Sequence, residues 1–276
     1  TLVITPLIAL MQEQVEKLKS LDISAEHISA GMSRGDVERI LNNTAEGAYK
    51  MLYISPERIQ TDLFNEYLPA MNVQLIAVDE AHCISQWGHD FRPDYLKIGT
   101  LREVFKNVPV LAVTASATRE VEQDIITQLG LKDVQVFNQS FERPNLAYTV
   151  QYSEQKNRDC LELLSRYKGS TIIYCRSRKQ TELLSKQLQQ SGINALPYHA
   201  GMANDKREEH RQFWTNNTTP VMVATTAFGM GIDKHDVRLV LHYDVPEHLE
   251  AYYQESGRAG RDGKPAQSVV LYNQQD

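Results

Sequence analysis

The chain has 276 residues, 42% hydrophobic and 23% charged, which is long and apolar enough for two folded α/β domains. This composition excludes a disordered or collagen-like chain, and no apolar run reaches the roughly 18 residues that a membrane span requires. The net charge is −6, and the acidic excess lies in the first half. A protein that coats nucleic acid through overall attraction is therefore disfavoured, and any phosphate-binding surface must be local.

Short β-branched runs alternate with amphipathic patterns, which predicts parallel sheets with crossover helices. In chain order, the first half gives strand Leu2–Thr5, helix Pro6–Leu21, helix Ser33–Asn43 capped by Ser33, strand Met51–Ile54, helix Asp62–Met71, strand Leu75–Val78, strand Val110–Thr114 and helix Thr118–Leu129. The second half gives helix Lys156–Tyr167, strand Thr171–Cys175, helix Arg178–Gln190, helix Asp205–Asn216, strand Val221–Thr225, strand Val237–His242, helix Glu247–Glu255 and strand Gln267–Leu271. Phe141–Asn145 lacks apolar periodicity and contains Pro144, so we expect a linker there, between α/β domains at residues 1–145 and 146–276.

The chain opens on strand-like residues, without Met or a signal sequence. We expect it to be a fragment that lacks its N-terminal segment. Cys83, Cys160 and Cys175 have no spacing typical of zinc ligands or of a disulfide framework. This pattern favours a reducing compartment, so we expect the chain in the cytoplasm and not at a membrane.

Two acids follow the predicted strand Leu75–Val78, in the order Asp79-Glu80-Ala81-His82. Open α/β sheets bind ligands at the carboxyl ends of their strands. An Asp at that place can hold the Mg²⁺ of a nucleotide through water, and an adjacent Glu can orient or deprotonate an attacking water. The alternative is a helix-capping Asp beside a solvated Glu, and for an isolated pair that alternative is the better one.

A glycine- and arginine-rich segment, Gln254–Gly263, follows the start of the helix predicted from Glu247. Three glycines at a spacing of three allow tight turns, and Arg258 and Arg261 can project together toward phosphate. The alternative is a glycine-terminated helix with two solvated arginines. A third segment, Ala224–Asp233, also follows a β-rich run.

These three segments resemble motifs II, VI and V of superfamily 2 helicases, specifically of the RecQ family of DNA helicases. Further stretches resemble motif Ia at Thr1–Gln14, motif Ib at Tyr53–Arg58, motif III at Val113–Thr118 and motif IV at Ile172–Arg178. The most family-specific piece is Cys83–Tyr95, which resembles the aromatic-rich loop of RecQ proteins and which related RNA helicases lack. The resemblance covers essentially the whole chain. It implies two RecA-like lobes with parallel sheets flanked by helices, the first lobe lacking its N-terminal phosphate-loop segment.

The resemblance implies ATP and Mg²⁺ as cofactors, and single-stranded DNA and DNA junctions as partners. It places Asp79 at Mg²⁺, through water, and Glu80 at the attacking water. Arg261, together with Arg258, stabilises charge on the transferring phosphate. The resemblance implies catalytic roles for Asp79, Glu80, His82, Gln254, Arg258 and Arg261, and nucleotide contacts from Asp79, Glu80, Gly231, Asp233, Arg258 and Arg261. It implies DNA contacts from Ser55, Trp87, Phe91, Arg92, Thr114 and His199.

Trp87 and Phe91 are four residues apart, in a segment that Gly88 and Pro93 make irregular. We expect this segment to expose its rings as platforms for base stacking, with Arg92 binding phosphate beside them. The alternative is packing in a core, which is what we expect for Trp214 on its amphipathic helix. His82 is expected to relay the nucleotide state to this loop, or else to be a capping histidine.

The sequence contains no Gly-x-x-x-x-Gly-Lys-Ser/Thr phosphate loop, because its one Gly-Lys pair, Gly263-Lys264, is followed by Pro265. We expect that loop upstream of Thr1, and the zinc, winged-helix and accessory domains of the family beyond Asp276. The resemblance implies an ATP-dependent helicase that moves 3′ to 5′ on single-stranded DNA and unwinds duplexes in repair and recombination. If the protein is bacterial, we expect it to associate with the nucleoid. This chain alone should be inactive. The alternative is a non-hydrolysing DNA-binding scaffold.

Overall fold

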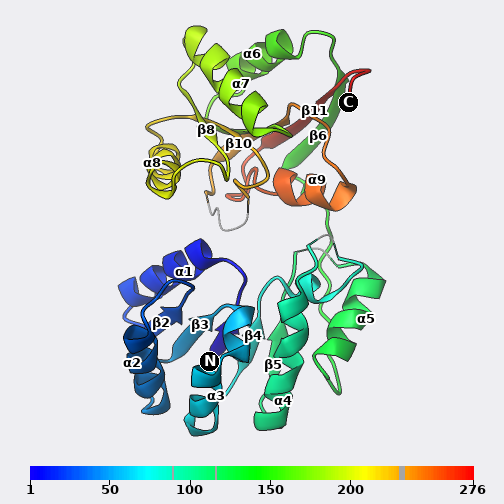
Figure 1. Cartoon of the computed structure of the whole chain (residues 1–276). Coiled ribbons are helices and arrows are strands. Elements are labelled where there is room, and N and C mark those ends of the chain that lie inside the picture. Colours follow the sequence, from blue (N-terminus) through cyan, green and yellow to red (C-terminus); the bar gives the residue numbers. More distant parts are fainter. Residues whose placement is uncertain (89, 116, 230–233) are drawn as a thin grey trace. The chain divides into compact units, whose positions relative to one another are not determined.

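The computed structural model describes residues 1–88, 90–115, 117–229 and 234–276. The chain forms two compact units, Thr1–Asn138 and Gln139–Asp276. Each unit has its own sheet, in which all described strand pairs are parallel, with helices beside it (Figure 1). This confirms the predicted fold class of two parallel α/β lobes. The unit boundary lies before the Phe141–Asn145 stretch, which therefore belongs to unit 2.

Unit 1 contains a sheet of strand order β2-β3-β1-β4-β5. Its elements are β1 (Leu2–Ile4), α1 (Ile8–Ser20), β2 (Ala25–Ile28), α2 (Arg34–Ala45), β3 (Met51–Ile54), η1 (Pro56–Gln60), α3 (Asp62–Tyr67), η2 (Leu68–Ala70), β4 (Ile76–Val78), η3 (Ala81–Ile84), η4 (Pro93–Thr100), α4 (Leu101–Val104), β5 (Val110–Ala112) and α5 (Arg119–Gln128). The elements marked η are 3₁₀ helices.

Unit 2 contains a sheet of strand order β6-β11-β10-β7-β9-β8. Its elements are β6 (Leu146–Tyr152), α6 (Lys156–Arg166), β7 (Ser170–Tyr174), α7 (Arg178–Gln190), β8 (Ala195–Tyr198), α8 (Asn204–Thr215), β9 (Val221–Ala224), β10 (Val237–His242), α9 (Leu249–Ser256) and β11 (Ala266–Tyr272). No helix in the described part of the chain combines the length and the apolar character that crossing a membrane requires.

The predicted helix starts and ends are partly confirmed. The Ser33 hydroxyl accepts a hydrogen bond from the Asp36 N–H at 3.1 Å, so Ser33 caps α2 as predicted. Helix α1 begins at Ile8 and not at Pro6. The helix predicted to reach Met71 ends earlier, at Tyr67, because the next turn tightens into the 3₁₀ helix η2, which contains Pro69.

Trp214 lies in the core of unit 2, as predicted, with 0% of its surface exposed. It packs edge-on against Phe228, with the ring centroids 5.2 Å apart. Its indole N–H donates to the Thr171 carbonyl at 3.2 Å. Trp214 therefore links α8 to the sheet and satisfies its single polar group in doing so.

Candidate active site and nucleic-acid surface

The carboxyl edge of the unit 1 sheet gathers the sequence-predicted residues of that unit. The parallel register sets Ile54, Ile4 and Val78 side by side on β3, β1 and β4. The residues that follow them, Ser55, Thr5 and Asp79, therefore lie next to one another at the carboxyl edge of the sheet. This is the edge at which open α/β sheets bind ligands.

Asp79 is held by hydrogen bonds to both oxygens of its carboxylate. The Thr5 hydroxyl donates to Asp79 Oδ2 at 3.1 Å, and the Glu80 N–H donates to Asp79 Oδ1 at 2.9 Å. The backbone N–H of Asp79 donates to the Ile4 carbonyl at 2.9 Å. Our sequence analysis missed Thr5, although its place directly after a buried strand was a signal that could have found it.

Glu80 has a left-handed backbone, with φ 48°, which is uncommon for a residue with a side chain. The peptide before it is held by Tyr95, a buried residue whose phenol donates to the Asp79 carbonyl at 2.9 Å. Burial, together with the nearby groups of Cys83 and Asp79, raises the pKa of Tyr95, so its phenol stays a donor. Tyr95 is a second residue that our sequence analysis did not assign.

His82 connects the acids to the end of β5. Its side chain is fully buried, and its Nδ1 lies 2.8 Å from the Thr114 hydroxyl and 3.3 Å from Glu80 Oε2. Glu80, His82 and Thr114 therefore form one contact group, built from the ends of β4 and β5. The predicted DNA contact Thr114 thus has its hydroxyl against a buried histidine.

The aromatic segment after His82 is anchored at its base and exposed at Trp87. Trp87 is 76% exposed, as predicted, whereas Phe91 is half-buried. The Ser85 hydroxyl accepts from the Trp87 N–H at 3.1 Å and donates to Asp124 Oδ2 at 2.6 Å. A Cβ on Gly88 would lie 2.5 Å from the His82 carbonyl oxygen, so this turn requires glycine.

Arg92, the predicted phosphate ligand, is paired within its own segment. Its Nε and Nη2 donate to one oxygen of Asp90, at 3.0 and 2.8 Å. Burial opposes the charge of Arg92, but the hydrogen bonds that it donates to Asp90 and the negative charge of Asp90 act together against it, and the pKa of the guanidinium is raised. A DNA phosphate would therefore compete with Asp90 for Arg92.

The two arginines of the glycine-rich segment in unit 2 differ in exposure. Arg258 is only 5% exposed, and its Nε has no hydrogen-bond partner among the described residues, whereas Arg261 is exposed. Helix α9 ends at Ser256, and Gly260 turns the chain with φ +62°, so Arg258 and Arg261 do not share one helical face. Gln254, on the last turn of α9, is half-buried.

Arg258 lies inside unit 2. Its Nη2 is 3.2 Å from the position of a Cβ on Gly229, a residue that lacks one. A buried pair stands nearby in sequence: Glu255 Oε2 lies 2.8 Å from His242 Nε2. The predicted nucleotide contacts Gly231 and Asp233 lie outside the described residues.

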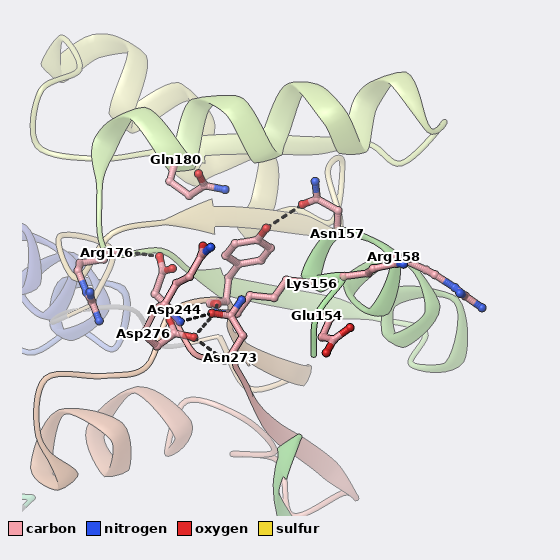
Figure 2. A pocket seen from close by; sticks show the side chains of 12 residues that line it. Glu154, Lys156, Asn157, Arg158, Arg176, Gln180, Asp244, Asn273 and Asp276 are labelled. Atoms are coloured by element: carbon pink, nitrogen blue, oxygen red, sulfur yellow. Dashed lines mark hydrogen bonds and ion pairs between the residues drawn. The ribbon is translucent and has the colours of Figure 1, made fainter. Parts of the chain in front are cut away.

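The carboxyl edge of the unit 2 sheet carries a polar pocket of about 610 Å³ (Figure 2). Lys156 is almost fully buried there, and its ammonium donates to Asp276 Oδ2 at 2.6 Å and to the Tyr243 carbonyl at 2.7 Å. Asp244 accepts from the backbone N–H of Arg176 at 2.7 Å. Burial opposes ionisation of Asp276, but the hydrogen bond and the charge of Lys156, together with backbone hydrogen bonds, lower its pKa overall. Our site prediction contained none of these residues, although Arg176 and Asp244 follow predicted strands.

His199 lines a second pocket in unit 2, of about 480 Å³, beside α7 and α8. His199 is nearly buried, and its Nε2 lies 3.1 Å from Glu182 Oε1. Its Nδ1 is buried without a hydrogen-bond partner in the described part of the chain. A Cβ on Gly201 would lie 3.3 Å from that nitrogen and 3.0 Å from Nη1 of Arg178. His199 and Arg178 therefore converge on the glycine turn.

Comparison with known proteins connects both units to one family. The DEAD/DEAH box helicase domain matches residues 1–124, and the helicase conserved C-terminal domain matches residues 155–263. The ATP-dependent DNA helicase RecQ of Haemophilus influenzae is 43% identical over 277 residues, which cover 100% of this chain and 45% of that protein. The chain belongs to the RecQ family, as a helicase core. This RecQ core spans less than half the length of the curated bacterial relatives it matches.

Solved structures show the same fold. The DUF1998 helicase MrfA bound to DNA has a TM-score of 0.82 and 17% identity, covering 99% of this RecQ core and 42% of that chain. The helicase Lhr of Mycobacterium smegmatis, bound to single-stranded DNA and AMP-PNP, has a TM-score of 0.75 and 19% identity, covering 98% and 39%. At these identities the likeness establishes the fold, two RecA-like lobes.

Proposed function

We propose that this RecQ core is the motor of an ATP-dependent helicase that moves 3′ to 5′ on single-stranded DNA and unwinds duplexes in repair and recombination. One observation carries the proposal: Glu80, His82 and Thr114 meet beside a doubly hydrogen-bonded Asp79, at the ligand-binding edge of the sheet. Membership of the RecQ family supports DNA as the partner. We also propose that the whole protein binds DNA junctions.

Asp79 is the residue that would hold Mg²⁺. Mg²⁺ prefers oxygen ligands and keeps several waters, so one or two carboxylates suffice beside the phosphates. The Asp79 carboxylate fits this demand, since Thr5 and Glu80 fix its orientation and each takes up one lone pair of one oxygen. When bound, Mg²⁺ neutralises charge on the phosphates.

Glu80 orients and deprotonates the attacking water in this proposal. Its left-handed backbone sets the direction of the side chain, and the Tyr95 hydrogen bond holds the peptide that precedes it. His82 touches both Glu80 and Thr114, so a change at either one is passed to the other. This supports His82 as the relay between the hydrolytic centre and the aromatic segment.

Arg261 supplies the positive charge at the transferring phosphate. Its exposure supports this role, whereas the burial of Arg258 supports a structural role inside unit 2. Gln254 senses the nucleotide, and Gly231 and Asp233 contact it, as the family resemblance implies. An arginine in this role is worth about 10³ to 10⁵ in rate.

DNA binds to both units. Exposed Trp87 stacks on a base, Phe91 supports it, and Arg92 binds phosphate once it exchanges its partner Asp90. Ser55 contacts the strand at the carboxyl edge of the unit 1 sheet. His199 Nδ1 has no hydrogen-bond partner among the described residues and lies, like Arg178, beside Gly201, and this supports a phosphate contact in unit 2.

The test measures ATP turnover. Because the sequence contains no phosphate loop, we would place a RecQ phosphate-loop segment before Thr1 and call the product the extended chain. Glu80→Gln should keep Mg-ATP affinity and nearly abolish DNA-stimulated turnover, and Arg261→Ala should lower kcat by about 10³-fold or more. The matched control is Glu38→Gln on the exposed face of α2, which should turn over like the parent.

The scaffold alternative predicts a different result. If the extended chain bound ATP and single-stranded DNA but hydrolysed ATP no faster than its Glu80→Gln variant, the core would be a DNA-binding scaffold and not a motor. If Arg261→Ala kept kcat within a few-fold of the parent, the phosphate role would move to Arg258.

A further inference from the structure

Residues 139–145, which we call the connecting segment, join the two units covalently and contact one loop of unit 2. This loop, residues 257–265, carries Arg258 and Arg261, and we call it the arginine loop. The sequence predicts residues 141–145 as a linker. In the structure, Arg143 and Asn145 make five hydrogen bonds to backbone carbonyls of the arginine loop.

Arg143 donates to the backbone carbonyls of three residues of the arginine loop. Its Nη1 donates to the Gly257 carbonyl at 3.4 Å, and its Nη2 donates to the carbonyls of Ala259 and Gly260, at 3.1 and 3.0 Å. A guanidinium presents five N–H donors in one fixed plane and stays protonated at all working pH values. One guanidinium can therefore donate hydrogen bonds to several backbone carbonyls at once.

Asn145 also donates hydrogen bonds to the arginine loop. Its Nδ2 donates to the Gly260 carbonyl at 2.8 Å and to the Lys264 carbonyl at 2.9 Å, and its own carbonyl accepts from the Ala266 N–H at 2.9 Å. A turn places both side chains, since the Arg143 carbonyl accepts from the Leu146 N–H at 2.9 Å across Pro144 and Asn145.

Gly260 shows how tightly the two segments fit. Its φ is +62°, and a Cβ there would lie 2.6 Å from Asn145 Nδ2. The Gly260 carbonyl accepts from both Arg143 and Asn145, and Arg261 is the next residue. The backbone from which Arg261 projects is thus fixed by the connecting segment.

The start of the segment is also attached to α9. The Tyr253 hydroxyl donates to the Phe141 carbonyl at 3.2 Å, and the two rings meet edge to face with centroids 5.3 Å apart. Helix α9 leads directly into the arginine loop. The connecting segment therefore contacts both the helix before the loop and the loop itself.

We propose that Arg143 and Asn145 are positioning residues, which set the place of Arg261 and on which ATP turnover depends. This inference rests on the proposed role of Arg261. A misplacement of about 1 Å at a reacting centre can cost about 10²-fold in rate. We call Arg143 and Asn145 the clamp residues. Loss of either one should therefore lower kcat by about 10- to 100-fold, less than the loss of Arg261 itself, while the KM for ATP changes by less than about threefold.

The kinetic test uses Arg143→Ala, Asn145→Ala and Arg143→Lys in the extended chain. Lysine keeps the charge but lacks the planar fork, so Arg143→Lys should stay below the parent in kcat. The matched control is Arg102→Ala in unit 1, because Arg102 also donates to three loop carbonyls, those of Phe105, Lys106 and Val108. This control should keep the kcat of the parent.

A second readout needs no nucleotide. In the 276-residue chain, amide hydrogen exchange of residues 257–265 should become at least about tenfold faster in Arg143→Ala and Asn145→Ala, and stay unchanged in Arg102→Ala. A rise spread evenly over unit 2 would overturn the inference, because it would mean general loosening.

The two proposals fail in different ways. If Arg261→Ala abolishes turnover while all three clamp variants match Arg102→Ala in kcat, the positioning role is refuted and the proposed function stands. If Arg261→Ala leaves turnover intact, the phosphate role of Arg261 fails, and the positioning inference fails with it, whatever hydrogen exchange reports.

Discussion

Replacing Gly260 by alanine should be one of the most damaging single-methyl changes in unit 2. The positive φ of +62° costs an L-residue about 1–2 kcal/mol. The added Cβ would also meet Asn145 Nδ2 at 2.6 Å and Ala266 Cβ at 2.9 Å, and such overpacking costs about 1–3 kcal/mol. We expect Gly260→Ala to lower the free energy of unfolding by about 2–5 kcal/mol.

Gly263 provides the control within the same loop. Its φ is +77°, but no atom lies within 4 Å of the position of its Cβ. Gly263→Ala should therefore cost only the backbone share, about 1–2 kcal/mol. The difference between the two variants isolates the close packing of Asn145, Ala266 and Lys264 around Gly260.

Urea unfolding followed by tryptophan fluorescence measures this difference. Trp214 is buried in unit 2, and in a Trp87→Phe background it is the one tryptophan left, so the signal reports on the unit that holds both glycines. With an m-value of about 2 kcal/mol per molar, the two midpoints should differ by about 0.5–1.5 M. Equal midpoints would refute the close packing around Gly260, the contact with Asn145 included.

Two further predictions concern Trp87 and Asp262. Trp87→Ala should weaken binding of a labelled single strand by roughly 5- to 100-fold at fixed salt, because stacking contributes about 1–3 kcal/mol per base; Phe137→Ala, which removes another exposed ring of unit 1, should not. Equal losses in both variants would show that Trp87 has no special role. The hydrogen bond from Arg238 lowers the pKa of Asp262, so this carboxylate stabilises the arginine loop above its unfolded-state pKa, and that stabilisation disappears as the pH falls through the lowered value. A carboxyl NMR titration should show the pKa of Asp262 rising toward about 3.9 in Arg238→Gln, and an unchanged titration would contradict the assignment.

Central strands were easier to predict from sequence than edge strands. The missed strands β2, β6 and β8 all lie at sheet edges, where the described sheets have a neighbouring strand on one side alone. The remaining edge strand, β5, was predicted. Strand β6 is mostly exposed, and β8 contains Pro197, which an edge strand tolerates because it has a free N–H side. Their apolar patterns are correspondingly weak. The strands β1, β3, β4, β7, β9 and β10 have buried runs and were predicted to within a residue or so.

In the candidate site, too, residues that a local sequence pattern marks were easier to predict than residues that act through contacts between distant segments. Asp79 and Glu80 could be predicted because a motif directly follows a buried strand. Tyr95 could not, since its role arises from a contact with the carbonyl of Asp79, a residue far from it in the chain. Thr5 follows a buried strand, so its place at the sheet edge could be predicted, but its hydrogen bond to Asp79 could not. Spacing alone also made Arg258 and Arg261 equivalent, whereas the left-handed turn at Gly260 separates a buried guanidinium from an exposed one.

The clamp by Arg143 and Asn145 has a consequence for exchanging lobes between helicases. A chimera joined at residue 146, where the sequence suggests the boundary, would give the arginine loop a foreign partner for four of its backbone carbonyls. A junction before Gln139 would transplant the loop together with the side chains that hold it. The transferable module of unit 2 therefore begins ahead of its first strand.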